Sequence, residues 1–278
     1  MRAKGVQEMP TIKAGEVSLE YYVEGDGPPL LMIMGFAGQA NSWGEPIMTR
    51  LRKRFTCIRF SNRGTGASDR PDTPFTIRMM ADDAIALLDA LDIRQPHVFG
   101  ISMGGIISQE IVLNYPGRVN GLVLGCTTPG FAHGEMAAPE VTAAMTPQPG
   151  LSVEEMVRNF WTAVCAPAFI EDSAEFLDEM IATNLKQATS MDTIMKQAVA
   201  IQTFDSFDRL SQIKAPTLVI HGDIDRLIPP ANGDVLAGGI AGAEKLTLNG
   251  AAHMFFWEQP AETADAIIEF LARVPAKV

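Results

Sequence analysis

Short apolar runs alternate with amphipathic helical segments along most of this chain. The run at 30–34 is continuous and strand-length, which is typical of a strand buried on both faces. We interpret 56–60 in the same way, and 97–101 is also strand-like. Between two of them lies 76–91, whose apolar residues recur at helical spacing. This alternation predicts an α/β fold with a mostly parallel central sheet and right-handed crossover helices. At 278 residues the chain is long enough to bury a substantial core.

The same patterns extend the prediction toward the C-terminus. Further strands are expected at 17–24 (an edge strand), 119–125, 216–221 and 244–248, and further helices at 103–115 and 261–272. From about 128 to 204 we find no convincing strand, while Ser152 and Glu155 form a capping-box pattern. We therefore predict a core domain over 1–127 and 205–278 and a helical cap over 128–204. Six methionines in the cap are expected either to roof a pocket or to fill helix–helix cores.

The charge balance limits the partners of this chain. Lysine and arginine number 22 and aspartate and glutamate 33, for a net charge of −11. An acidic surface repels phosphate backbones and anionic lipid, so we expect no nucleic-acid and no membrane partner. No apolar run approaches the ~20 residues that span a bilayer. Cys57, Cys126 and Cys165 have no metal-ligand spacing, so we expect no metal, reduced thiols and a cytoplasmic location.

The sequence Gly100-Ile101-Ser102-Met103-Gly104 is the strongest local signal for chemistry. The pentapeptide G-x-S-x-G is weak alone, but here a predicted strand precedes it and a predicted helix follows it. That context is the one a nucleophile elbow requires, with a serine hydroxyl raised at the tip of a strained turn. We therefore predict Ser102 as a nucleophile.

A serine nucleophile needs a base, and the base needs a carboxylate. Among four histidines, His253 follows the last predicted strand on a loop at the same sheet edge as Ser102, while His97 and His221 lie within or at the ends of strands. Asp223 and Asp225 both follow the strand at 216–221, and spacing alone does not choose between them. Either choice gives the chain order Ser, Asp, His.

Backbone N–H groups are the expected donors for a developing oxyanion. Met103, directly after the nucleophile, supplies one. The glycine-rich turn after the strand at 30–34 supplies the other, and Phe36 is our choice there.

On these residues the chain resembles the α/β-hydrolase superfamily over nearly its whole length. The matching segments are 34–36, 61–68, 100–105, 222–229 and 250–253, with Glu258-Gln259-Pro260 beyond. The family element G-x-x-D-x-x-x-P falls on Gly222, Asp225 and Pro229, so the resemblance implies that Asp225 is the triad acid. It also implies that the insertion is the family's helical cap. Met34 replaces a common histidine and Ser61 replaces a common aspartate.

Within the superfamily the chain looks like carboxylesterases, enol-lactonases and meta-cleavage C–C hydrolases. The resemblance implies an enzyme without cofactor that cleaves a carboxylic ester or lactone of a moderately apolar small molecule through an acyl-enzyme. Three alternatives stay open: hydrolysis of a C–C bond in a vinylogous diketone, a hydrolase-fold protein that only binds a ligand, and a cofactor-free oxygenase.

Candidate substrate-binding residues follow from position. Open α/β sheets bind ligands beyond the carboxyl ends of their strands, where Gly35, Trp43, Thr127 and Leu227 lie. The predicted cap adds the aromatic residues Phe131 and Trp161, because apolar pockets are the norm.

Overall fold

The structure, a computed structural model, describes residues 10–145, 150–186 and 188–275. In this part of the chain one eight-stranded sheet runs in the order β1-β2-β4-β3-β5-β6-β7-β8. β1 and β2 pair antiparallel, as do β2 and β4, and the remaining neighbours are parallel. The strands are β1 (Thr11–Ala14), β2 (Val17–Glu24), β3 (Pro29–Ile33), β4 (Thr56–Phe60), β5 (His97–Ile101), β6 (Leu122–Gly125), β7 (Thr217–Gly222) and β8 (Glu244–Leu248). The predicted mostly parallel α/β fold is confirmed.

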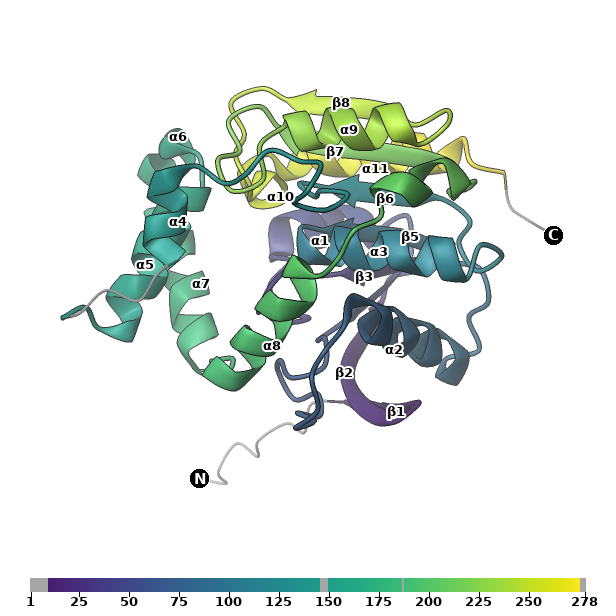
Figure 1. Cartoon of the computed structure of the whole chain (residues 1–278), viewed down its shortest axis with the longest axis horizontal. Helices are drawn as coiled ribbons and strands as arrows, with labels where there is room; N and C mark the ends of the chain where they lie inside the picture. The colour runs from purple at the N-terminus through teal and green to yellow at the C-terminus, as the bar shows by residue number, and fades with distance from the viewer. Residues whose placement is uncertain (1–9, 146–149, 187, 276–278) are drawn as a thin grey trace.

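Helices cover both faces of the sheet, and alternate strand residues pack against each layer (Figure 1). Leu31 and Ile33 of β3 belong to one core cluster, with residues of α2, α3 and α9. Leu30 and Met32 of the same strand belong to the other, with residues of α1, α10 and α11. The core helices are α1 (Glu45–Leu51), α2 (Ile77–Ala90), α3 (Met103–Asn114), α9 (Ala231–Gly239), α10 (Phe255–Glu258) and α11 (Pro260–Ala272), with a 3-10 helix η1 (Phe207–Gln212).

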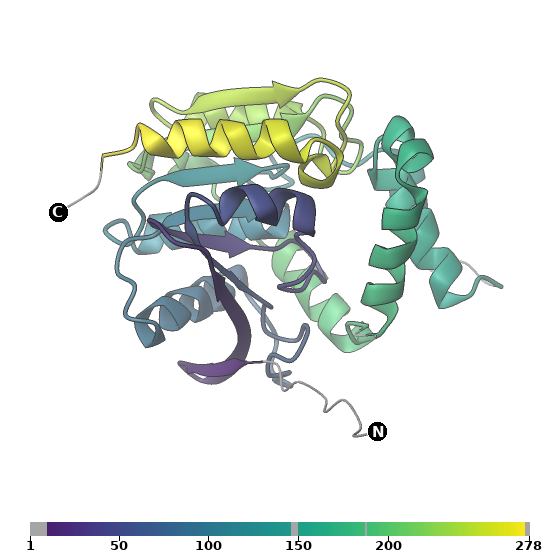
Figure 2. The same cartoon turned by 180° about the vertical axis from the view of Figure 1, so that it is seen from behind.

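Between β6 and η1 the described chain is helical. It forms α4 (Pro139–Met145), α5 (Val153–Val164), α6 (Pro167–Asp172), α7 (Ala174–Lys186) and α8 (Met191–Gln202). These helices lie together on one side of the sheet (Figures 1 and 2), and an antiparallel bridge between Gly130 and Asp205 joins the two connecting segments. The capping box of Ser152 and Glu155 at the start of α5 is confirmed. The division at residues 128 and 204 into core and cap domains stays a prediction.

Three expectations differ from the structure. β2 is not an edge strand, because the short strand β1 lies outside it. The strand expected from residue 119 begins at Leu122. Four of the six methionines expected in a pocket roof or a helix core are instead exposed: Met136, which precedes α4, Met145 of α4, and Met191 and Met195 of α8.

Among the described residues, no helix combines the length and the apolar character needed to cross a bilayer. Within the same residues no group of three or more His, Cys, Asp or Glu side chains is arranged to hold a metal ion. All three cysteines are free and buried.

Candidate active site

Ser102 occupies a strained turn between β5 and α3. Its φ of 53° and ψ of −122° lie outside the regions that L-residues ordinarily adopt. The turn is held by backbone contacts, because Ser102 N donates to Gly125 O at 2.9 Å and the Thr127 hydroxyl donates to Ser102 O at 2.8 Å. The Ser102 side chain itself stays partly exposed. Such strain is characteristic of functional sites, where the surrounding structure holds a residue in an unfavourable conformation.

The glycines around Ser102 are explained by the close approach of β3, β5 and α3. A Cβ at Gly104 would overlap the carbonyl oxygen of Ile33. A Cβ at Gly100 would overlap Gly104 O and the hydroxyl of Ser108. The spacing of glycines that marked this motif in the sequence is therefore a packing requirement of the turn.

Asp225 and His253 form a buried pair on the loops that follow β7 and β8. His253 Nδ1 lies 2.8 Å from Asp225 Oδ2, and the two side chains are almost fully buried. The other carboxylate oxygen, Oδ1, accepts the backbone N–H of Leu227 at 2.9 Å and that of Ile228 at 3.0 Å. The two oxygens of Asp225 therefore have different partners, and Oδ2 is the one directed at the imidazole.

Asp223, the other aspartate on this loop, has a separate contact. Its Oδ1 accepts the backbone N–H of Gly250 at 2.7 Å and is exposed to solvent. It ties the loop after β7 to the loop after β8. The geometry thus pairs Asp225, and not Asp223, with His253.

The electrostatics of the site distinguish its histidines. Burial has the largest single effect and would lower the pKa of His253, but the Asp225 carboxylate and the Cys126 side chain together outweigh it and hold that pKa well above the ordinary value of 6.5. Burial lowers the pKa of His221 to about 4. His221 is therefore neutral near pH 7, while His253 is the histidine that the carboxylate stabilises as a cation.

Cys126 is a site residue that the sequence analysis did not identify. It follows β6 with a left-handed φ of 39° and is fully buried. Burial raises the pKa of its thiol, whereas hydrogen bonds with the His253 side chain and the Ser102 backbone oppose that rise. The thiol therefore contacts both the proposed base and the nucleophile turn. Its position directly after a parallel strand was the available signal.

The loop that carries His253 is anchored to the inserted helices. His253 N donates to Val164 O at 3.1 Å. The Glu258 carboxylate accepts Ala252 N at 2.6 Å with one oxygen and Ala166 N at 3.0 Å with the other. Glu258 thus connects the histidine loop to the start of α6, a role that its place in the Glu-Gln-Pro segment did not reveal.

The loop after β3 lies against Ser102. A Cβ at Gly35 would be 3.0 Å from Ser102 Cβ, so only glycine fits comfortably there. Residues 35–38 form a turn in which Gly38 N donates to Gly35 O at 3.1 Å. Phe36 is the second residue of this turn, and Met103 is the first residue of α3, directly after Ser102. That their backbone N–H groups bind an oxyanion stays a prediction.

The other predicted pocket residues have varied surroundings. Trp43 is fully buried and packs against Phe99 and Phe256 in the core. Trp161 is partly exposed and packs on Trp257 with ring centroids 5.0 Å apart. Phe131 is partly exposed. Thr127 and Leu227 contact the site through the hydroxyl and the backbone amide described above, so these contacts position Ser102 and Asp225.

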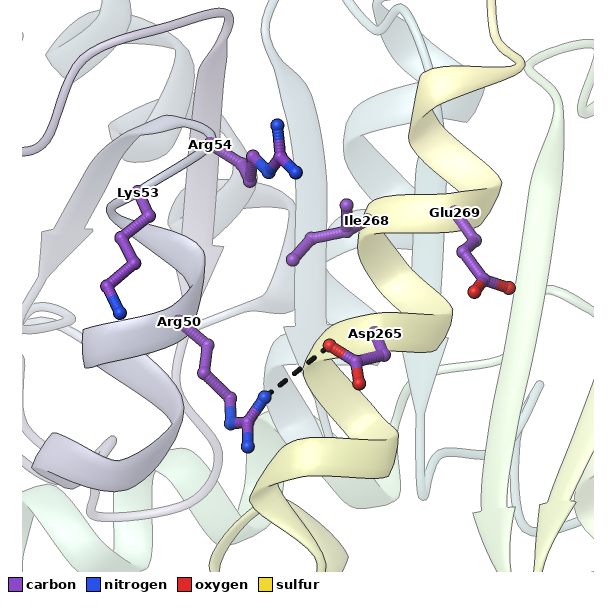
Figure 3. Close-up of a pocket in the computed structure, with 6 residues that line it drawn as sticks. All are labelled: Arg50, Lys53, Arg54, Asp265, Ile268 and Glu269. Atoms are coloured by element: carbon purple, nitrogen blue, oxygen red, sulfur yellow. Dashed lines mark ion pairs between the residues drawn. The ribbon is translucent and has the colours of Figure 1, made fainter.

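A surface hollow of about 360 Å³ lies elsewhere, between the end of α1 and α11 (Figure 3). Arg50, Lys53 and Arg54 line it from the side of α1, Asp265, Ile268 and Glu269 belong to α11, and Arg50 pairs with Asp265 at 3.6 Å. Its charges are of both signs, and its lining contains none of the predicted site residues.

Comparison with known proteins gives a consistent result. A family profile described as alpha/beta hydrolase fold matches residues 28–260. A relative from Azorhizobium caulinodans, provisionally named carbamate hydrolase RutD, is 30% identical over 95% of this chain and 97% of its own length. 3-Oxoadipate enol-lactonase 2 of Acinetobacter baylyi is 30% identical over 90% of this chain and 91% of its own. The solved structure of Est816, described as an N-acyl homoserine lactone degrading enzyme, has a TM-score of 0.80 and 28% identity, covering 94% of this chain and 100% of that one.

Proposed function

This chain belongs to the alpha/beta hydrolase family and is a hydrolase, and we propose that it cleaves a carboxylic ester or lactone with Ser102, His253 and Asp225. The observation that carries this proposal is the combination of a strained, partly exposed Ser102 with a buried Asp225–His253 pair on neighbouring strand loops. The named lactone-cleaving relatives favour a cyclic or open carboxylic ester over other acyl compounds.

The chemistry proceeds in two balanced halves. Ser102 Oγ attacks the acyl carbon while the Nε2 atom of His253 takes the hydroxyl proton, and Asp225 stabilises the resulting imidazolium. The bond to the leaving oxygen then breaks, and that oxygen takes the proton from His253. With a lactone, the freed hydroxyl or enol stays attached to the acyl group. Water, deprotonated by His253, then attacks the acyl-enzyme. The bond between the acyl carbon and Ser102 Oγ breaks, Oγ takes the proton back from His253, and the carboxylic acid leaves.

The developing oxyanion needs donors that are already in place. Met103 N–H, at the start of α3, is not used by the helix ladder and lies at the positive end of the helix dipole. Phe36 N–H, on the turn against Ser102, is the proposed second donor. Removal of one such donor typically costs about 10²–10³ in kcat.

Fluorophosphonate labelling tests the nucleophile directly. We expect the reagent to label wild-type protein at Ser102, as mapped by peptide mass spectrometry, and we expect the folded Ser102→Ala variant to remain unlabelled. Ser108→Ala is the matched control, because Ser108 lies on the same helix with its hydroxyl bonded to Gly104 O at 2.7 Å. Labelling that persists in folded Ser102→Ala, or a wild type that does not label, contradicts the proposal.

A substrate panel then tests the reaction class. We expect turnover of 4-nitrophenyl acetate or an acyl lactone, lost in Ser102→Ala, and less or none with a 4-nitrophenyl carbamate. Consumption of a vinylogous diketone with no turnover of esters or lactones would replace this proposal by C–C bond hydrolysis.

A further inference from the structure

Ala37 has an unfavourable backbone conformation beside the proposed oxyanion donor. It is the third residue of the turn over 35–38 and has a φ of 55°. That position of a turn with positive φ favours Gly or Asn, because a Cβ is disfavoured there. An alanine in this conformation therefore requires contacts from outside the turn to hold it.

Those contacts come from α8 and from the residues directly before it. Gln197 of α8 accepts the backbone N–H of Ala37 with Oε1 at 2.9 Å. The Thr189 hydroxyl donates to the carbonyl oxygen of the same residue at 3.1 Å. Both backbone polar groups of Ala37 are thus bonded to residues more than 150 positions away in the chain.

The burial of Gln197 is the reverse of what the hydrophobic pattern of α8 predicts. It is fully buried together with Thr193, whereas Met191, Met195 and Val199 on the same helix are exposed. Burial of an amide is costly unless it is hydrogen-bonded. Within the described chain the Nε2 atom of Gln197 has no hydrogen-bond partner. The Ala37 N–H fixes the orientation of the amide group, since Oε1 is the only atom of the side chain that can accept a hydrogen bond.

We propose that Gln197 is a positioning residue for the oxyanion hole. By fixing the peptide between Phe36 and Ala37, Gln197 holds Ala37 in its left-handed conformation. The Phe36 N–H belongs to the preceding peptide, whose Gly35 carbonyl closes the same turn by accepting the Gly38 N–H, so a turn held at Ala37 also limits the direction of the Phe36 N–H. Thr189 supports the same residue from the carbonyl side. The inserted helices therefore act on catalysis through the turn after β3. This inference rests on the proposed function, in which Phe36 N–H binds the oxyanion.

The test replaces Gln197 by methionine, which keeps the length of the side chain and removes the acceptor. We expect kcat for 4-nitrophenyl acetate and the rate constant of fluorophosphonate labelling to fall by about 10- to 10²-fold, with little change in KM, because displacement of a catalytic donor by about 1 Å has effects of this size. We also expect faster hydrogen exchange at the Ala37 amide. Gln202→Met is the matched control, since Gln202 is exposed at the end of the same helix.

Replacement of Ala37 by glycine distinguishes a role of Gln197 in positioning the turn from a general loss of stability. Glycine adopts positive φ without steric cost, so Ala37→Gly should recover part of the kcat lost in Gln197→Met. Equal losses in the two backgrounds, or a folded Gln197→Met variant with wild-type kcat and labelling rate, would overturn the inference. If wild-type Ser102 does not label, the proposed function fails instead, and exchange at the Ala37 amide still reports whether Gln197 holds the turn.

Discussion

Replacement of Asp225 by asparagine tests the proposed triad most sharply, because the structure dictates how the new amide must lie. Oδ1 of Asp225 accepts two backbone N–H groups, from Leu227 and Ile228. The carbonyl oxygen of asparagine must take that position, since an NH₂ group there would face two donors. The NH₂ group then points at His253 Nδ1, where Oδ2 now lies at 2.8 Å.

This orientation reverses the tautomer of His253. An NH₂ donor makes Nδ1 the acceptor and leaves the ring proton on Nε2, so the ring cannot take the proton of Ser102. Loss of the carboxylate also removes the charge that stabilises the imidazolium. We expect kcat to fall by about 10⁴-fold, which corresponds to about 5 kcal/mol in the activation free energy.

The assay is steady-state hydrolysis of 4-nitrophenyl acetate together with the rate of fluorophosphonate labelling. Asp223→Asn is the matched control, because Asp223 is two residues away and bonds only to the Gly250 amide among the contacts described above. Thermal melting checks that both variants are folded. A folded Asp225→Asn variant within tenfold of wild type, or equal losses in the two variants, would refute the reasoning.

Three further predictions concern pH and stability. The value of kcat/KM should rise with pH through a midpoint above 6.5, because Asp225 raises the pKa of His253 and only the neutral ring acts as a base; a pH–rate profile with a midpoint below 6 would contradict this. Gly104→Ala should lower the free energy of unfolding in urea by at least about 2 kcal/mol through overpacking, whereas Gly117→Ala, in open space, should change it little. Arg63→Met should cost about 3–5 kcal/mol, because it leaves Asp83 buried without its partner at 2.6 Å, and Asp83→Leu in the same chain should restore most of the loss.

Features with a local cause were predictable from the chain alone. Apolar runs identify β3 and β5 because strands covered on both faces bury most of their side chains. β4 was identified in the same way, although Thr56 and Arg59 in it are only partly buried. The glycines around Ser102 predicted the strained turn between β5 and α3 because they permit a close approach within one strand–helix unit. β1 escaped prediction because only one of its four residues, Ala14, is buried, so its pattern carries little periodicity.

Contacts between distant segments required the tertiary structure. Asp223 and Asp225 are two residues apart on one loop, and both remained candidates for the triad acid until the family resemblance favoured Asp225. In the structure, the loops after β7 and β8 bring Asp225 Oδ2 to His253. Tertiary packing also determines which face of α8 is buried. Its sequence offers Met191 and Met195 as core residues, yet packing against the turn at Ala37 buries Gln197 instead. The sequence by itself thus determined the strands other than β1, the turn at Ser102 and the order of the polar residues, because these depend on neighbours in the chain. The partner of each polar group depends on the relative placement of whole elements, which only the folded chain decides.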